Sequence, residues 1–334
     1  MKEMTAAISL LYSIPISRIV SLKDEKVFLV ITKKDRFVLK LIPYPPMETG
    51  FITDAMNYLS QSGFHSFNEL IPTADGQMWG RFRNHCTLLT KELHGHIPSY
   101  KKKEDVTAIA SYLAELHNAA THFFPIHRFE QRIKWGTMIH TMEQSRDDLI
   151  FLKETVNKKE EKDAFDTSFL QYCDHYIEEI KRSAEAMNTF YPQLCEEKQP
   201  YGGFCHHDPA YHNFLIDSNG TVGAFDFDYA IADLSAHDCA ALLLKVLKTN
   251  HWELSAGLHC LGNYNRNRHL DKNELKFIYW LLAYPYDFHH AAFARYKEEN
   301  HQHRIEKKLF RLIREKEKRE ALLQAIKPYL LEEP

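Results

Sequence analysis

The stretch from Cys205 to Ala230, CHHDPAYHNFLIDSNGTVGAFDFDYA, gathers carboxylates, an amide and histidines around a short apolar hairpin. Asp208 precedes Asn213 by five residues, and Asp226 follows Asn213 by 13 residues, at the end of a predicted strand. Transfer of a phosphoryl group needs a carboxylate that orients the attacking hydroxyl and accepts its proton, together with oxygen ligands for Mg²⁺. The spacing therefore indicates Asp208 as a base and Asn213 and Asp226 as magnesium ligands.

The Asn219-Gly220 pair predicts the register of this hairpin. Asn-Gly is the strongest short-range signal for a two-residue type I′ turn, because both residues accept positive φ. With these two residues as the loop, Asn213 faces Asp226 across the two strands. Directly opposed residues have Cβ atoms about 4.5–5.5 Å apart, so one divalent cation can take an oxygen from each. We therefore expect a metal site at the open end of the hairpin, with Asp208 beside it.

The same residues allow a second interpretation, a metal cage for hydrolysis. Two His-Asp pairs, His207-Asp208 and His237-Asp238, resemble the ligand pairs of HD-type metal phosphohydrolases. Those pairs need a helical backbone, whereas Pro209 pushes Asp208 toward an extended conformation. This alternative is therefore the weaker one, and His206 is better interpreted as a structural residue that braces the loop through hydrogen bonds.

The elements that must position these residues follow from the hydrophobic pattern. Residues 17–42 carry three β-type runs, residues 47–63 form one amphipathic helix, and residues 68–92 return to strand character with Asp75-Gly76 as a hairpin signal. From residue 96 onward the pattern is helical, with a stripe at 106–123 and a helix at 234–248 that is apolar nearly all round. The sequence thus predicts an α+β, two-lobed fold: a small antiparallel β lobe with one helix at 1–95, and a large mainly helical lobe at 96–334 that carries the hairpin of about 201–230.

Composition excludes several other classes. The formal net charge of -3 gives no electrostatic support for a nucleic acid or an anionic membrane as partner. The six cysteines form no CxxC pair, which is typical of reduced thiols in a core. No apolar run reaches the ~18 residues of a membrane span. We therefore expect a soluble protein made in the cytoplasm.

At this point the chain resembles a known family over nearly its whole length. It is similar to the aminoglycoside phosphotransferase and choline kinase superfamily, which has a protein-kinase-like fold. It is most similar to the spore-coat-associated kinase-like proteins of endospore formers, the CotS/YutH group. The phrases that carry the resemblance are, in chain order, VLKLI, LLTKELHG, LAELH, HHDPAYHN, FDFDYA, DLSAHDCAALL and LLAYPYDFHHAAFARY.

The resemblance implies a role for each site residue and for two cofactors, ATP and Mg²⁺. Asp208 would be the catalytic-loop base, and Asn213 and Asp226 would bind the metal. Lys40 would hold the nucleotide phosphates, and residues Thr90 to Leu93, which include Glu92, would form the hinge that meets adenine. Asp228 would be a second acid, and Asp238 would accept amide hydrogen bonds from the catalytic loop. It also implies synthesis in the mother cell, association with the spore coat, other coat proteins as partners and a small-molecule substrate.

Two features depart from the family pattern. No glycine precedes Gly50, so the loop SLKDEKVF lacks the residues that let a backbone approach phosphates closely. Ile52 stands where the glutamate partner of Lys40 is expected. Glu48, one turn earlier, either substitutes for it or only favours the helix dipole, so the partner of Lys40 stays unassigned. Three function classes therefore stay open: an active small-molecule kinase, a catalytically degenerate kinase fold that binds or builds the spore coat, and a metal phosphohydrolase.

Overall fold

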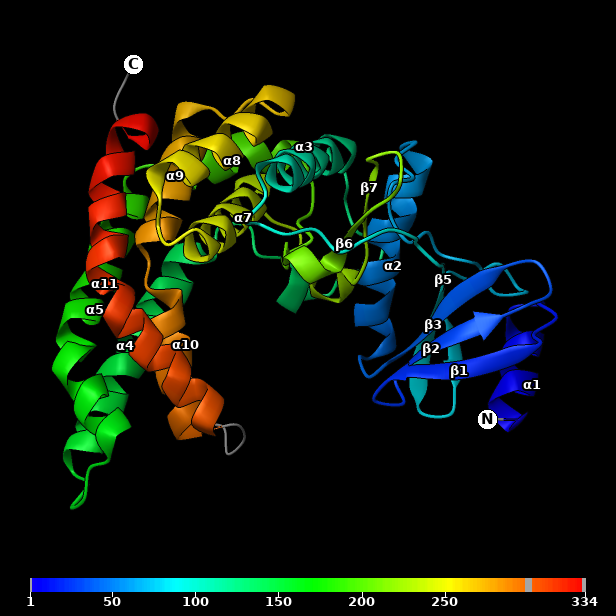
Figure 1. Ribbon diagram of the computed structural model, residues 1–334, viewed down its shortest axis with the longest axis horizontal. Coiled ribbons are helices and arrows are strands. Elements are labelled where there is room, and N and C mark those ends of the chain that lie inside the picture. The colour runs from blue at the N-terminus through cyan, green and yellow to red at the C-terminus, as the bar shows by residue number, and fades with distance from the viewer. Residues whose placement is uncertain (1, 298–301, 332–334) are drawn as a thin grey trace.

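The computed structural model describes residues 2–297 and 302–331 and has two parts (Figure 1). A small sheet lies at one end of the molecule, and a larger helical mass lies at the other, with α2 (Pro46–Gln61) and a short hairpin between them. Among the described residues, no helix combines the length and the apolar character needed to span a membrane.

The sheet has five antiparallel strands in the order β1-β2-β3-β5-β4. The three β-type runs predicted within residues 17–42 form its first three strands. Its strands are β1 (Arg18–Lys23), β2 (Val27–Ile31), β3 (Arg36–Ile42), β4 (Gly80–Phe82) and β5 (His85–Lys91). The Asp75-Gly76 pair forms a turn, with the Gly76 N–H donating to the Thr73 carbonyl, but the hairpin that joins β4 to β5 turns at Arg83 instead.

The sequence predicted one helix in this part, and the structure has two. The second helix is α1 (Lys2–Leu11), which packs under the sheet through the buried Ile8. Tyr12, just after α1, donates a hydrogen bond to the Thr87 carbonyl in β5 (3.0 Å). Because α1 is short and Pro15 follows closely, its own pattern is weak. Packing against the sheet stabilises it.

Helix α2 forms where the sequence predicted it. Pro46 occupies its first turn, and Gly63 follows its end with a φ of +80°. Its buried side chains, including Phe51 and Ile52, belong to the same hydrophobic cluster as those of the helical part. The helix therefore packs against the part of the chain that carries the predicted site.

The helical part contains α3 through α11 and a two-stranded hairpin. Its helices are α3 (Lys103–Ala119), α4 (Met138–Asn157), α5 (Ala164–Asn188), α6 (Tyr191–Lys198), α7 (Ser235–Thr249), α8 (Leu254–Asn267), α9 (Lys272–Ala283), α10 (Tyr286–Lys297) and α11 (Gln302–Leu330), and its hairpin is β6 (Phe214–Ile216) with β7 (Val222–Ala224). Helices α4, α5, α10 and α11 form an arm that stands apart from the centre of the molecule (Figure 1).

The hairpin is hydrogen-bonded to two chain segments, one before β4 near residue 68 and one after β5 near residue 96. The Asn68 N–H donates to the Ala224 carbonyl (3.1 Å), and His96 and Ile216 exchange two backbone hydrogen bonds (2.9 and 3.0 Å). Next to His96, Gly95 has a φ of +153°, and a Cβ at this position would lie 2.5 Å from the Ile216 carbonyl oxygen. Only glycine lets the connecting segment pass so close to the β6 backbone.

Candidate functional site

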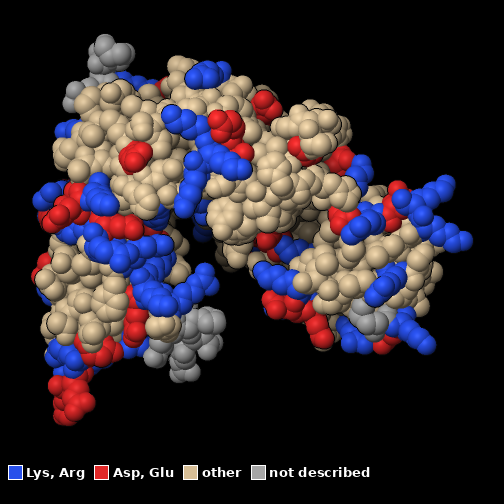
Figure 2. Space-filling model, viewed as in Figure 1, with Lys and Arg blue, Asp and Glu red and all other residues tan. Residues whose placement is uncertain are grey.

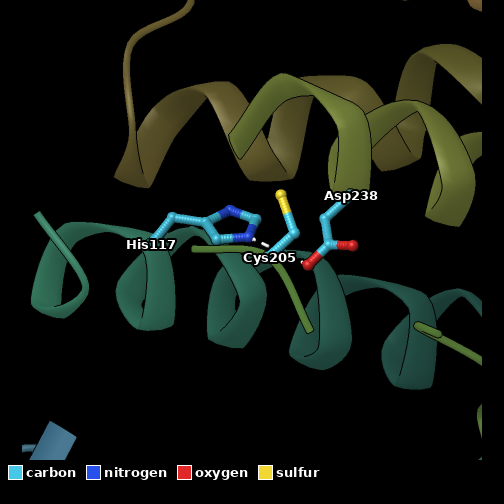
Figure 3. Close-up of side chains that lie close together, drawn as sticks. All are labelled: His117, Cys205 and Asp238. Atoms are coloured by element: carbon cyan, nitrogen blue, oxygen red, sulfur yellow. Dashed lines mark hydrogen bonds and ion pairs between the residues drawn. The ribbon is translucent and has the colours of Figure 1, made fainter. Parts of the chain in front are cut away.

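Asp238 anchors the loop that carries Asp208. This aspartate lies in the first turn of α7 and is completely buried. Its Oδ2 accepts the His206 N–H (2.6 Å), and its Oδ1 accepts the His207 N–H (2.8 Å). His117 of α3 donates from Nε2 to the same carboxylate (3.2 Å; Figure 3). One carboxylate therefore ties the loop to two helices.

The charge on Asp238 is strongly favoured. Burial raises the pKa of a carboxyl group, but the hydrogen bond from His117 outweighs this effect and lowers the pKa of Asp238 to about 2. The pKa of His117 is lowered, chiefly by burial, so the imidazole stays neutral. With Nε2 carrying the proton, Nδ1 accepts from the Tyr264 hydroxyl (2.7 Å).

Cys205 lies beside His117 and Asp238, and these three side chains together have the donor types of a metal site (Figure 3). Each of them, however, already has a hydrogen-bond partner. The Cys205 thiol donates to the Leu234 carbonyl (3.1 Å), and burial raises its pKa well above the ordinary value. A protonated thiol is a poor metal ligand. We interpret the cluster as a structural network that holds the loop.

Asp208 is held between an amide and an ammonium group. Asn213 donates from Nδ2 to Oδ2 of Asp208 (2.8 Å) and to its backbone carbonyl (3.0 Å). Lys245, from α7, donates to Oδ1 (3.0 Å). Burial raises the pKa of Asp208, but Lys245 and the Asn213 hydrogen bond lower it below the ordinary value. The carboxylate is thus ionised and oriented, as a proton acceptor must be.

His206 connects this loop to the segment that contains Asp226. Its Nε2 donates to the Phe225 carbonyl (3.0 Å), and its Nδ1 faces the Asp208 N–H (3.4 Å). The side chain is completely buried against Phe227, with 4.7 Å between the ring centres. His206 therefore braces the backbone on both sides of the hairpin.

The predicted hairpin register is wrong by one residue. Phe214 pairs with Ala224, and the Phe225 N–H donates to the Asn213 carbonyl (3.0 Å), so Asn213 faces Phe225 and not Asp226. The turn has three residues rather than two, and of these only Gly220 has a positive φ (+83°). The cause is Asp217, whose Oδ1 accepts the N–H groups of Asn219 (2.8 Å) and Thr221 (2.9 Å).

Asp226 reaches the site through its backbone conformation instead of strand pairing. Its φ of 68° and ψ of 54° are left-handed, which is uncommon for a residue other than glycine, although aspartate adopts it more readily than most residues. The left-handed conformation turns the chain away from the direction of β7 at residue 226. The carboxylate then lies next to Lys40.

Lys40, in β3, contacts two carboxylates of the helical part. Its Nζ lies 2.5 Å from Oδ1 of Asp226 and 2.7 Å from Oδ2 of Asp228. Burial lowers the pKa of Lys40, but Asp228 and Asp226 outweigh burial, and the net pKa is raised. The pKa of Asp228 is raised, first by burial and then by the charge of Asp226, although Lys40 opposes the change. The lysine is therefore charged and fixed at the junction of the two parts.

Glu48, the candidate substitute for the missing partner of Lys40, pairs with another residue. It forms an ion pair with Arg132 (2.7 Å), whose guanidinium is largely buried and stacks on Tyr44 with 5.2 Å to the ring centre. Arg132 also donates to the Ala230 carbonyl (2.8 Å). Glu48 thus fixes the end of the FDFDYA segment, through a residue that sequence reasoning did not single out. Ile52 is completely buried in the core.

The remaining candidate residues are placed as follows. Glu92 pairs with Arg36 of β3 (2.8 Å), and the neighbouring Leu93 lies against Gly223 of the hairpin. The two His-Asp pairs do not form one cage, because His237 pairs with Asp233 (2.8 Å) while Asp208 pairs with Lys245.

The turn between β1 and β2 is short and acidic. Asp24 and Glu25 both have positive φ values (46° and 51°), and the Lys26 N–H donates to the Lys23 carbonyl (2.9 Å). These are the features of a type I′ turn built without glycine. Two carboxylates therefore stand at the tip of the glycine-free loop between the first two strands.

Residues 16–278 match the phosphotransferase enzyme family. No curated protein matches the chain. A solved aminoglycoside phosphotransferase from Alicyclobacillus acidocaldarius is 21% identical, with a TM-score of 0.83 over 99% of this chain and 96% of that one.

Two further solved structures are more distant in sequence. A spectinomycin phosphotransferase in complex with ADP and spectinomycin is 13% identical, with a TM-score of 0.70 over 97% of this chain and 98% of that one. A choline kinase from Streptococcus pneumoniae is 13% identical, with a TM-score of 0.53 over 94% and 97%. The chain has the two-lobed, kinase-like fold of these proteins, as the sequence predicted.

Proposed function

Because the chain belongs to the phosphotransferase enzyme family, we propose that it transfers the γ-phosphoryl group of ATP to the hydroxyl group of a small molecule. The observation that carries this proposal is the pairing of Lys40 with Asp226 and Asp228, since it joins a cation of the sheet to carboxylates of the helical part. Phosphoryl transfer relies on positioning and on charge stabilisation by such groups.

In this proposal the two lobes, 1–95 and 96–334, share the work. Lys40 holds the nucleotide phosphates, and the hinge residues Glu92 and Leu93 lie beside the adenine. Asp208, ionised and oriented by Asn213 and Lys245, accepts the proton of the attacking hydroxyl. His206 and Asp238 hold the loop in place.

The two carboxylates beside Lys40 suit Mg²⁺, a hard cation that prefers carboxylate and amide oxygens. Asp226 and Asn213 would hold it, with Asp228 close by. Asn213 would use its Oδ1, because its Nδ2 donates to Asp208. When bound, Mg²⁺ neutralises charge on the phosphates. An amicoumacin kinase solved with AMP-PNP and Ca²⁺ (TM-score 0.62, 16% identical) supports the use of a nucleotide and a divalent cation.

The test is nucleotide binding followed by turnover. We expect ATP with Mg²⁺ to raise the melting temperature of the wild type, because a ligand that binds only the folded state stabilises it by mass action. With an accepted substrate, Asp208→Asn should lower kcat by about 10²–10⁴-fold, the usual contribution of a general base. A wild type that shows no shift with millimolar ATP and Mg²⁺ would end the kinase proposal.

A second candidate function is a catalytically degenerate kinase fold that binds other proteins. The type I′ turn with Asp24 and Glu25 favours it, since their carboxylates would repel phosphates in that position. The resemblance of FDFDYA and DLSAHD to the CotS/YutH group supports a place in the spore coat, with synthesis in the mother cell and other coat proteins as partners. Immunodetection in coat extracts of sporulating cells tests this; a signal confined to the soluble fraction would count against it.

A further inference from the structure

Two lysines of α7, Lys245 and Lys248, lie on the side of the helix that meets Asp208. Lys245 and Lys248 are three residues apart, so they project from the same face of the helix. Lys245 donates to Oδ1 of Asp208 (3.0 Å), and Lys248 pairs with Oδ2 of Asp287 in the first turn of α10. The Lys245–Asp208 ion pair therefore has a second ion pair, Lys248–Asp287, next to it along the same face of α7.

Helix α11 adds further positive charge at this place. Lys308 donates to Oδ1 of Asp287 (3.0 Å), and Arg311, one turn along α11, is close enough to act electrostatically on Lys248. Lys245, Lys248, Lys308 and Arg311 thus supply four cations around the carboxylates of Asp208 and Asp287. Arg319 and the carboxylate of Glu315 line the same cavity as Lys248 and add one charge of each sign. Figure 2 shows basic side chains gathered along the hollow between the α10–α11 arm and the centre of the molecule.

The two lysines on α7 retain donors for a ligand. An ammonium group has three N–H donors, and one on Lys245 and one on Lys248 are used by the two carboxylates. Their side chains are 37% and 25% exposed, so the remaining donors can be reached. The pKa of Lys248 is lowered, first by burial, and the charges of Lys308 and Arg311 act in the same direction although Asp287 opposes them. A bound anion would offset the repulsion between Lys248 and the like charges of Lys308 and Arg311.

We propose that the acceptor is an anionic hydroxyl compound, whose carboxylate or phosphate group is bound by Lys245 and Lys248 while its hydroxyl faces Asp208. The inference rests on the proposed phosphotransfer and names the substrate class. The hydroxyl oxygen forms a bond to the γ-phosphorus of ATP, the bond from that phosphorus to the β–γ bridging oxygen breaks, ADP leaves and the hydroxyl proton passes to Asp208. A cationic amino alcohol would instead place its charge beside Lys245, where like charges repel.

Titration calorimetry in the presence of ADP and Mg²⁺ tests this with four probes. D-glycerate and glycerol 3-phosphate carry the anion, glycerol is their neutral counterpart, and choline is cationic. We expect at least one anion to bind about tenfold more tightly than glycerol, and choline to bind no better than glycerol. The two anions separate a carboxylate site from a phosphate site, and ADP release from ATP shows which of them is phosphorylated.

Two matched variants assign the site. Lys248→Met should weaken binding of the preferred anion about tenfold. Lys181→Met removes the same charge from the exposed face of α5 and should leave it unchanged. Circular dichroism confirms folding of both, and Lys245→Met provides a second reading at the same site.

The outcomes separate this inference from the proposed function. Equal binding of glycerol and the anions, preferred binding of choline, or anion binding that neither Lys248→Met nor Lys245→Met affects would overturn the anionic acceptor. Stabilisation by ATP and Mg²⁺ would then still support phosphotransfer to another substrate. If ATP and Mg²⁺ fail to stabilise the wild type, the acceptor role falls with the kinase proposal, even where an anion binds.

Discussion

The Nζ of Lys40 lies 2.5 Å from Oδ1 of Asp226, although the two residues are 186 positions apart in the sequence. The lysine comes from the central strand of the sheet, and the aspartate follows the hairpin of the helical part. This ion pair joins the segment expected to hold phosphates to the segment expected to hold the metal.

Asp226→Asn is expected to remove the Mg²⁺-dependent part of stabilisation by ATP. Asparagine also adopts the left-handed conformation, so the fold should persist while a charged metal ligand is lost. In the wild type, ATP and Mg²⁺ at about 100 times Kd should stabilise by about 2.7 kcal/mol. Thermal shifts with and without Mg²⁺ measure the difference.

The control for this experiment is Asp174→Asn, an equal change on the exposed surface of α5. It should leave the ATP response unchanged. Should ATP stabilise the Asp226 variant as strongly as the wild type, with or without Mg²⁺, the protein would bind nucleotides with its metal site elsewhere.

Glu48→Ala is expected to destabilise the protein by about 3–5 kcal/mol, because it leaves the buried Arg132 without its charged partner. Arg132→Met combined with Glu48→Ala removes both charges and should cost less than Glu48→Ala alone. Urea unfolding of the three proteins measures this. A double variant that is less stable than the single one would show that the Arg132 bond to the Ala230 carbonyl matters more than the ion pair.

Asp238 should contribute an acid-sensitive part of the stability. Its folded-state pKa is lowered to about 2 from an ordinary value of 3.8, so its stabilising effect is fully present above about pH 4 and is lost as the pH falls toward 2. The effect is on the order of 2 kcal/mol. Urea unfolding at pH 5, 4 and 3 should therefore show the wild type losing more stability than Asp238→Asn; parallel losses would contradict it.

Gly95→Ala is expected to destabilise the protein by about 1–3 kcal/mol, because the position has a φ of +153° and the new Cβ would meet the Ile216 carbonyl. Gly262→Ala in α8 is the matched control. Apart from the adjacent residues and the backbone of α8 itself, no described atom lies within 4 Å of a Cβ there, and alanine favours the helix by about 0.5–1 kcal/mol. Thermal unfolding should thus move in opposite directions for the two variants.

Much of the fold follows from the local pattern. The three strands within residues 17–42 and the buried helix predicted at 234–248, observed as α7, were predicted because their periodicity and burial agree. Helix α1 was missed because ten residues carry little signal without the sheet they pack on. The hairpin register was wrong because the side chain of Asp217 captures two N–H groups, which outweighs the Asn219-Gly220 preference.

The partners of the site residues could not be predicted in the same way. Lys245 reaches Asp208 across 37 residues, and Arg132 reaches Glu48 across 84. A helix that is apolar nearly all round hides the few polar positions that face a site. The sequence therefore indicated candidate groups for the chemistry, whereas the tertiary fold decides which cations accompany them.

The attachment of the hairpin to residues 66–68 and 96 has a consequence for synthesis on the ribosome. All five strands of the sheet are complete at residue 91, but the β6 and β7 backbone that receives both connecting segments ends at residue 224. At about 5–20 residues per second, translation needs roughly 7–27 s to cover that interval. The nascent sheet must wait that long for its docking surface. Chaperones that shield newly made chains are expected to meet this protein in that interval.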